Sequence, residues 1–402
     1  MSSEKWYWME PFRFEGQAVI LEQGVWHDRP AYGLNRSLFY PEGGGQLGDR
    51  GTISFGGETR IVIDTQIRED EMILVIVNEQ FPADVIGKLV EQRVNEEWRR
   101  RQMSQHTGQH LLSRFLQERY EAPTISARLG EQTFSVDVQA TLFTPEQWAE
   151  IEDGLNTLIL EDRPIRAWFP TAEELATLSL RKQPSVQEQI RIVQVEGFDV
   201  TPCGGTHCTR TGQVGMVHLQ SIEKYKQCMR ITASAGLDAV RDARKKEAIY
   251  RELQVRLSAT PDTIISQIDL LRAQEQALAT RLKERTQKLA NRHASEIGMS
   301  KMEGVLVEAV LNEDNLEYAR MLAKELAKQT SKIALVSCPV SDGAFVVLDQ
   351  LEKNRGDVGA ILKEVLQEDG GKGGGGALHA EGRVRTQEGI ARLRARLEGS
   401  AG

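Results

Sequence analysis

The sequence predicts an α+β protein made of four consecutive parts: a small β-barrel at residues 1–90, a zinc-containing α+β core at 91–240, a helical hairpin arm at 241–300 and a C-terminal α/β glycine-rich domain at 301–402. Three observations carry this prediction. Short strand-like runs dominate the first part, polar helical patterns fill the third, and strands alternate with helices in the last. A length of 402 residues agrees with two or three domains of about 150 residues each.

Composition and charge restrict the class of protein. Hydrophobic residues make up 40% of the chain and charged residues 27%, as in a globular protein. The net charge of −8 gives no global sign of nucleic-acid binding, although such binding depends on local patches. No apolar run approaches the roughly 20 residues of a membrane span, and the first residues lack the apolar region of a signal peptide. The four cysteines do not form a secreted disulfide framework, so we expect a reducing, cytoplasmic compartment.

The first 90 residues are typical of a small barrel or sandwich. Strand-like runs occur at Gln17–Leu21, Ile61–Ile63 and Met72–Val77, and turn-forming Gly, Asp and Asn residues separate them. No stretch here has a convincing helical pattern. Several short strands without helices favour a small barrel.

A glycine-rich loop interrupts this β-rich part. Gly43, Gly44 and Gly45 follow one another and Gln46 comes next, so this stretch of backbone carries no side chains. One interpretation is a flexible hairpin loop. The other is a loop whose backbone N–H groups approach a ligand closely, which glycine permits. The residues alone leave both interpretations open.

A histidine pair lies in the first helix predicted for the core. Residues Glu96–Arg119 contain no proline, and their apolar positions fit a helix. On a helix, residues four apart share one face, about 5–6 Å apart at Cβ. His106 and His110 are therefore placed to bind one metal ion together.

Capping patterns and strands follow along the core. Thr144 as N-cap, with Pro145 next and Gln147 three residues on, begins a second helix, and a capping box at Thr171 begins another. The strands expected after these helices are Ile190–Val195, Val214–Leu219 and Met229–Ser234. The loop between the first two carries Cys203 and His207.

Two short motifs together predict a Zn²⁺ site. Each pair, His106 with His110 and Cys203 with His207, has three residues between its members. Histidines with a thiolate form a ligand set that zinc prefers, and only 7 His and 4 Cys occur in the chain. A protease of the His-Glu type is excluded, because its general base follows the first histidine and Thr107 stands there. Cys208 breaks the spacing, so we expect it not to be a ligand.

The sequence predicts two polar helices in residues 241–300. Thr260 and Pro261 mark a fresh helix start after a break. A heptad-like apolar stripe follows, interrupted by Glu275 and Arg285. Its members are Ile264, Ile268, Leu271, Leu278, Leu282 and Leu289. We expect an antiparallel hairpin or coiled coil that serves as an arm or as a dimer contact.

The last hundred residues end in a cationic glycine-rich stretch. Strands at Lys332–Ser337 and Gly343–Leu348 alternate with two helices, and the run Gly370–Gly376 follows. From residue 370 onward six cationic side chains face three acidic ones, a net of +3 that leaves −11 on the rest of the chain. A phosphate-binding surface is one interpretation, and a solvated flexible tail is the other.

At this point the residues resemble a family. The stretch from His106 to Leu112 together with Cys203–His207 is similar to the editing domain of alanyl-tRNA synthetases, and the related domain of threonyl-tRNA synthetases shares the pattern. The loop Phe39–Gln46 resembles the glycine-rich motif ahead of that domain. Residues 370–383 resemble the C-terminal domain that engages tRNA. Cys208, where the synthetases more often have an apolar residue, is a minor departure. No aminoacylation domain precedes the barrel, so we expect a freestanding alanyl-tRNA editing protein of the long type.

The resemblance implies hydrolysis of the ester in tRNA(Ala) mischarged with serine, or with glycine. A synthetase pocket for alanine excludes an analogue that adds only a hydroxyl by a factor of order 10², whereas a pocket built to hydrogen-bond that hydroxyl discriminates by roughly 10⁴ or more. Substrate-binding candidates are Gly43, Gly44, Gly45, Gln46, Thr107 and Gln109, and tRNA-binding candidates are Lys372 and Arg383. The sequence identifies no general base.

Other interpretations stay open beside this one. Four protein ligands usually close a zinc site, so the metal is catalytic, substrate-anchoring or structural. A non-catalytic tRNA-binding module stapled by zinc is one alternative function, and an editor of Ser-tRNA(Thr) is another. The partners expected are tRNA(Ala) and a second copy of the chain, bound through the arm or the C-terminal domain, with no membrane.

Overall fold

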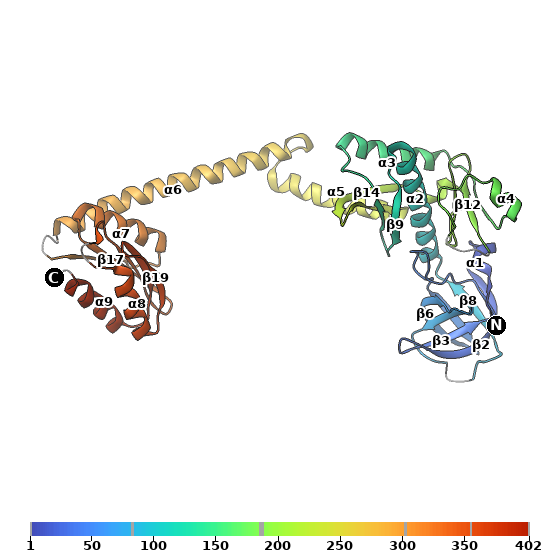
Figure 1. The fold of residues 1–402 in the computed structure, drawn as a ribbon, viewed down its shortest axis with the longest axis horizontal. Helices are drawn as coiled ribbons and strands as arrows, with labels where there is room; N and C mark the ends of the chain where they lie inside the picture. The colour runs from blue at the N-terminus through green and yellow to red at the C-terminus, as the bar shows by residue number, and fades with distance from the viewer. Residues whose placement is uncertain (1, 82–83, 185–188, 301–303, 354–355, 401–402) are drawn as a thin grey trace. The chain divides into compact units, whose positions relative to one another are not determined.

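The computed structural model describes residues 2–81, 84–184, 189–300, 304–353 and 356–400. The chain divides into two compact units, Met1–Glu252 and Leu253–Gly402. Figure 1 shows the order of their elements along the chain.

The first unit begins with the predicted barrel. Six strands close in the order β2-β3-β7-β6-β5-β8. Their bounds are β2 Glu15–Trp26, β3 Arg29–Leu34, β5 Gly51–Phe55, β6 Glu58–Ile67, β7 Ile73–Val77 and β8 Leu89–Val94. Alternate residues such as Ile20, Ile53 and Val75 are fully buried inside it, as the period of two along a strand requires.

A short N-terminal segment forms a separate two-stranded sheet beside the barrel. Strand β1 (Glu4–Lys5) pairs in parallel with β4 (Arg36–Ser37), and the helix α1 (Trp6–Met9) follows it. No helix was predicted in this part, and for α1 that prediction was wrong. Four residues are too few to show a helical period, so no pattern could reveal this turn.

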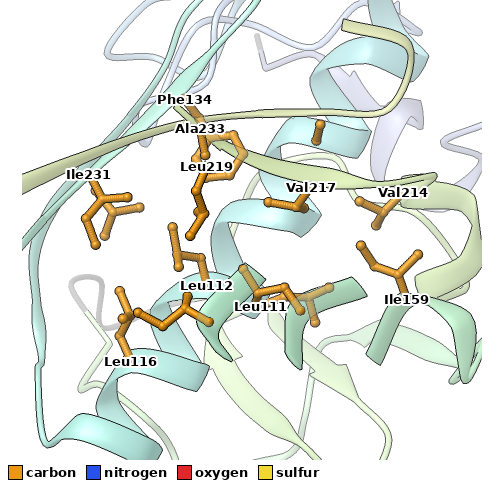
Figure 2. Packing of buried hydrophobic residues seen from close by; sticks show 14 of the residues in the cluster. Leu111, Leu112, Leu116, Phe134, Ile159, Val214, Val217, Leu219, Ile231 and Ala233 are labelled. Atoms are coloured by element: carbon orange, nitrogen blue, oxygen red, sulfur yellow. The ribbon is translucent and has the colours of Figure 1, made fainter. Parts of the chain in front are cut away.

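The predicted helix of the core is present as α2 (Glu96–Tyr120). Its N-cap Asn95 accepts a hydrogen bond from the backbone of Trp98. α2 packs on a four-stranded sheet of order β14-β15-β10-β9. The strands are β9 Thr124–Leu129, β10 Phe134–Val138, β14 Val217–Tyr225 and β15 Cys228–Ala235. Figure 2 shows Leu111, Leu112 and Leu116 of α2 in one cluster with side chains of this sheet.

Two further helices of the core confirm the capping patterns. α3 (Pro145–Leu160) begins with a complete capping box at Thr144, and α4 (Ala172–Thr177) begins with another at Thr171. A three-stranded sheet of order β11-β12-β13 lies in the same unit. Its strands are β11 Ile165–Trp168, β12 Ile192–Val195 and β13 Asp199–Pro202.

Some strand predictions needed correction. The run from Val214 to Leu219 is strand only from Val217, because Thr211–Val214 form the 3₁₀ helix η1. Likewise β12 begins at Ile192 rather than at 190. The strands β9, β10, β11 and β13 were not predicted, since four to six residues give too short a pattern to distinguish from loop.

The helical part breaks where predicted. Helix α5 (Leu237–Leu257) ends before the 3₁₀ turn η2 (Pro261–Thr263), and α6 (Ile264–Ser300) continues from it. A capping box at Thr260 accompanies the break. The side chains of the apolar stripe from Leu271 to Leu289 are exposed on α6. Antiparallel pairing of the two helices stays a prediction.

The second unit ends in a five-stranded sheet of order β16-β17-β18-β20-β19. Its strands are β16 Leu306–Val310, β17 Ile333–Val340, β18 Gly343–Asp349, β19 Lys372–Gly375 and β20 His379–Val384, and its helices are α7 Leu316–Thr330, α8 Val358–Asp369 and α9 Gln387–Gly399. The glycine run is therefore an edge strand, and the flexible-tail interpretation was wrong. A Cβ on Gly373 would lie 2.3 Å from Cα of Gly382, so this pairing requires glycine.

Candidate metal centre

Four side chains from two distant segments meet in the first unit. Helix α2 supplies His106 and His110, and the loop after β13 supplies Cys203 and His207. One ligand atom from each of the four lies within 4.8 Å of the others. The Sγ atom of Cys203 lies 3.4 Å from Nε2 of His106 and 3.2 Å from Nε2 of His207. The two predicted half-sites thus form one cluster.

Burial and neighbouring side chains shift the pKa values of three residues in the cluster. It lowers the pKa of His110 well below the ordinary value and, with the help of His106, lowers the pKa of His207 to about 4. Burial alone raises the pKa of the Cys203 thiol, but the three neighbouring imidazoles hold it well below its ordinary value. Neutral imidazole and thiolate are the forms that bind a metal ion.

Hydrogen bonds orient the histidine rings. Nδ1 of His106 lies 2.8 Å from Oε1 of Gln46, and Nδ1 of His207 lies 3.3 Å from Oγ1 of Thr107. Nδ1 of His110 faces Asp199, with 3.9 Å to Oδ2. Partners on the Nδ1 side leave Nε2 of each ring for a metal.

The cluster therefore fits a metal ion. Four ligands around zinc, at its usual bond lengths of about 2.0–2.3 Å, lie roughly 3.3–3.8 Å from one another. The distances from the Cys203 sulfur to the two imidazole nitrogens agree with that spacing. The four residues could therefore hold a metal ion.

The glycine-rich loop of the barrel supports this cluster. Gln46 is fully buried, and its Oε1 accepts hydrogen bonds from both His106 and the backbone N–H of Thr206 at 3.0 Å. Its Nε2 donates to Oγ1 of Thr206 at 2.8 Å. Gly45 has a φ of +87°, and a Cβ there would lie 2.7 Å from the carbonyl oxygen of Ala127. The loop is thus a fixed support rather than a flexible hairpin.

The predicted substrate contacts have protein partners in this structure. The polar atoms of Gln46 serve His106 and Thr206, and Oγ1 of Thr107 accepts from the backbone N–H of Cys208 at 3.1 Å. The amide of Gln109 donates to Ser113 at 2.7 Å. Contact of Gly43, Gly44, Gly45, Gln46, Thr107 or Gln109 with a substrate stays a prediction.

A buried ion pair ties α2 to the same loop. Arg99 is completely buried, and its guanidinium pairs with the carboxylate of Asp49. It also donates to the carbonyl oxygens of Pro11 at 2.8 Å and Leu38 at 2.6 Å. Asp49 accepts from the backbone N–H of Tyr40 at 2.6 Å, at the start of the loop. Neither residue was predicted, and a charged side chain on the buried face of α2 is the signal that the sequence offers.

The cysteine loop has its own supports. Nη1 of Arg191 donates to the carbonyl oxygens of Cys203 at 3.0 Å and Gly205 at 2.9 Å. A Cβ on Gly205 would lie 2.1 Å from Cε1 of His106, so only glycine fits between loop and ring. Neither Arg191 nor Asp199 was predicted, since each lies outside the spaced motifs.

Cys208 lies outside the cluster. Its side chain is buried, and this burial raises the pKa of the thiol to about 11. A thiol that stays protonated is a poor metal ligand. Within the described ranges, the four predicted residues form the one group of His, Cys, Asp and Glu that could hold a metal.

The predicted tRNA-binding residues lie in the second unit. Lys372 is exposed on β19, and Arg383 on β20 forms an ion pair with Asp342 at 3.1 Å. Arg394 pairs with Glu308 at 2.6 Å and Arg396 with Glu368 at 2.6 Å. Local acidic partners thus balance much of the positive charge of the last segment. Binding of tRNA by Lys372 and Arg383 stays a prediction.

A closed barrel precedes the α+β domain, and its glycine-rich loop supports the His₃Cys cluster there. Residues 190–232 match the family model described as "Threonyl and Alanyl tRNA synthetase second additional domain". This match includes the Cys203 loop.

Longer matches identify the family. The "Alanyl-tRNA editing protein AlaX-L" of Pyrococcus horikoshii is 31% identical over 96% of this chain and 95% of its own length. The chain belongs to this alanyl-tRNA editing protein family, and the prediction of an editing enzyme is confirmed at that level.

Synthetases match over the same stretch. The "Alanine--tRNA ligase" of Ignicoccus hospitalis is 28% identical over 90% of this chain, which spans 40% of that ligase. The C-Ala domain of Aquifex aeolicus alanyl-tRNA synthetase aligns with 24% of this chain and 91% of that domain, at 23% identity and a TM-score of 0.22.

Across the described ranges, no helix combines the length and the apolar character that a membrane span requires.

Proposed function

We propose that this protein hydrolyses the ester bond of tRNA(Ala) mischarged with serine, and with glycine as a second substrate, at a zinc-loaded metal centre. The observation that carries the proposal is the cluster of His106, His110, Cys203 and His207 in a chain of the alanyl-tRNA editing family. The name of the Pyrococcus horikoshii relative indicates the tRNA on which we expect this protein to act. The buried cluster is where we expect the reaction to take place.

The residues of the chain prepare the site in three ways. Burial lowers the pKa of His110 and of His207, and Nδ1 partners fix the direction of the His106 and His207 rings. Arg191 holds the cysteine loop by two backbone carbonyls and places a positive charge beside it. Such a preorganised charge favours the developing oxyanion of an ester under hydrolysis. When bound, zinc would supply a further positive charge that polarises a substrate oxygen or a water molecule.

The experiment that tests the reaction is a deacylation assay. The purified protein is incubated with Ser-tRNA(Ala), Gly-tRNA(Ala), Ala-tRNA(Ala) and Ser-tRNA(Thr), with and without a chelator. We expect release of serine and glycine from tRNA(Ala), little release of alanine, and loss of activity with the chelator. Inactivity on all four would support the non-catalytic tRNA-binding module, and preference for Ser-tRNA(Thr) would support the threonyl-type editor.

The ligand assignment has a matched pair of variants. Cys203→Ala removes the sulfur of the cluster, whereas Cys208→Ala removes a buried thiol five residues away that lies outside it. We expect the first to lose zinc and deacylation together and the second to keep near-normal zinc, measured by elemental analysis. Full zinc in Cys203→Ala, or a marked loss in Cys208→Ala, would overturn the assignment.

The remaining expectations belong to the same proposal. The C-terminal domain would recruit the tRNA body through exposed cations such as Lys372, and the arm or that domain would join two copies of the chain. The compartment would be the cytoplasm, where charged tRNA is used. The family supports the tRNA partner, and the exposed stripe on α6 supports self-association.

A further inference from the structure

The three imidazoles of the metal centre are not equally well oriented. Nδ1 of His106 and Nδ1 of His207 each lie within hydrogen-bond range of a side-chain oxygen, at 2.8 and 3.3 Å. Nδ1 of His110 faces the carboxylate of Asp199, but the distance to Oδ2 is 3.9 Å, too long for a hydrogen bond. An outer partner fixes the direction of a ligand histidine and raises its basicity. His110 is therefore the most weakly held of the three rings.

The carboxylate of Asp199 is fixed by contacts of its own. The residue is 3% exposed, and Nε of Arg181 donates to both carboxylate oxygens, at 2.9 and 3.1 Å. The backbone N–H of Arg181 donates to the carbonyl oxygen of Val200 at 2.8 Å. Carboxylate and guanidinium thus form a buried pair that is anchored on strand β13. A hydrogen bond between Asp199 and His110 therefore requires the imidazole to move by about 1 Å.

This movement of the ring is opposed to metal binding. The two nitrogens of an imidazole point in diverging directions, so Nε2 of His110 is left for a metal ion while Nδ1 faces Asp199. The four ligand atoms of the cluster lie within 4.8 Å of one another. A shift of the ring toward the carboxylate draws Nε2 away from the other three ligand atoms. The ring gains one partner as it gives up the other.

We propose that His110 is the exchangeable ligand of the metal centre, alternating between the metal ion and a hydrogen bond to Asp199, which Arg181 holds ready for the ring. The inference rests on the proposed function. In the exchange, the bond from Nε2 to the metal breaks and its electron pair stays on the ring. The proton stays on Nδ1 and is donated to the carboxylate. Three protein ligands and one open position then remain, as in catalytic rather than structural zinc sites.

Metal affinity distinguishes an exchangeable ligand from a fixed one. His106→Gln and His110→Gln are a matched pair on one helix, and each is titrated with a chelator in the full-length zinc protein. We expect His110→Gln to weaken zinc binding about tenfold less than His106→Gln, because an outer partner is worth about 10- to 100-fold in affinity. Equal losses of zinc in the two variants would overturn the proposal.

Asp199→Asn tests the receiving group. We expect zinc affinity to stay close to that of the wild type, because Asp199 makes no hydrogen bond to the ring in its ligating position. The value of kcat for Ser-tRNA(Ala) should fall by about tenfold, with little change in KM. A loss of zinc affinity without a change in kcat would show that Asp199 is only an ordinary outer partner.

Two further variants control for folding. The double variant Arg181→Ala, Asp199→Ala removes both members of the buried pair, so neither charge is left unpaired inside the protein. It should match Asp199→Asn in zinc affinity and in kcat. Asp153→Ala, at an exposed position of α3, should match the wild type in both.

NMR of labelled histidine side chains observes the exchange without any substrate. In the zinc-loaded wild type, the His110 ring should show relaxation dispersion on the microsecond-to-millisecond timescale, and the rings of His106 and His207 should not. In Asp199→Asn the dispersion at His110 should be reduced, since the released ring loses its charged acceptor. Three equally static rings in the wild type would overturn the proposal.

The outcomes separate this inference from the proposed function. If the wild type deacylates Ser-tRNA(Ala) but all three imidazoles behave alike in affinity and in dynamics, the inference is overturned and the function stands. If His110 alone exchanges and its replacement costs the least zinc affinity, but no charged tRNA is hydrolysed, the inference stands and the function fails.

Discussion

The side-chain oxygen of Gln46 lies 2.8 Å from Nδ1 of His106, although 60 residues separate them in the chain. The glycine-rich loop of the barrel therefore orients a histidine of the metal centre. This contact connects the barrel to the core. A substitution in the barrel loop should therefore change the affinity of the core for a metal ion.

Gln46→Ala removes this orienting contact. We expect zinc affinity to fall by about 10- to 100-fold, the usual effect of losing an outer partner of a ligand histidine, with little change in fold. Competition with a chelator measures the affinity, and circular dichroism checks the fold. Gln23→Ala, an exposed position on the same barrel, serves as control. Equal zinc affinity in the two variants would contradict the role assigned to Gln46.

Gly205 and its neighbour Gly204 form a second matched pair. A Cβ on Gly205 would lie 2.1 Å from the His106 ring, whereas one on Gly204 would meet its nearest neighbour, Trp8, at an ordinary 3.8 Å. Gly205→Ala should therefore displace the ring or the loop and reduce zinc content and deacylation strongly. Gly204→Ala should keep both above about half of the wild-type value. Zinc content per chain and initial rates decide the comparison.

The buried imidazoles predict acid sensitivity of the metal-free protein. The pKa of His207 is lowered to about 4 in the folded chain, against about 6.5 in an unfolded one. Between these values the unfolded chain binds the extra proton, so the free energy of unfolding should fall as pH drops from 6.5 to 4, by roughly 3 kcal/mol for such a shift. Urea unfolding at several pH values measures this. The slope should be shallower in His207→Gln.

The second unit is expected to serve tRNA binding rather than the reaction, because all four ligands lie in the first unit. Removing residues 258–402 should keep zinc bound and raise KM for Ser-tRNA(Ala) far more than it lowers kcat. Affinity of the full chain should fall steeply with salt, since each phosphate neutralised releases counterion, and the shortened chain should show a shallower slope. Unchanged KM and slope would exclude tRNA binding by this unit.

The exposed stripe on α6 has a symmetry that predicts how two copies would pair. In an antiparallel pair centred on Thr280, Leu278 meets Leu282 of the second copy, and Glu275 meets Arg285. The four leucines of the stripe are 51 to 68% exposed: Leu271, Leu278, Leu282 and Leu289. The two charged interruptions thus become a complementary pair that fixes register.

Charge exchange tests this pairing. Glu275→Arg should place two cations opposite each other and weaken the dimer by about tenfold or more, and the double variant Glu275→Arg, Arg285→Glu should restore it. Analytical ultracentrifugation over a concentration series gives the dissociation constant. A monomeric wild type, or a double variant no better than the single one, would exclude this arrangement.

Local sequence patterns predicted the helices that have a long apolar periodicity or a complete N-terminal capping motif. Helix α2, with its histidine pair, and the helices begun by Thr144 and Thr171 appear where the sequence placed them. Joining the two half-sites needed ligand chemistry as well, because nothing local relates His106 to Cys203. The residue types and equal spacing were enough to do so.

Contacts between distant segments could not be predicted in the same way. Asp199 faces His110 only because β13, a strand of four residues, runs past α2. Trp8 reaches Gly204 across 196 residues, from a helix of a single turn. Arg99 and Asp49 find each other inside the protein, where each alone would be costly to bury. Such pairings depend on topology, which periodicity does not encode.

The division of the ligands between two segments has a consequence for synthesis. Cys203 leaves the ribosome 97 residues after His106, which takes roughly 5 to 20 s at translation rates of about 5–20 residues per second. During that interval His106 and His110 have been synthesised but Cys203 and His207 have not. A metal ion offered to the nascent chain would find two of its four candidate ligands, so full coordination would have to wait for the second pair.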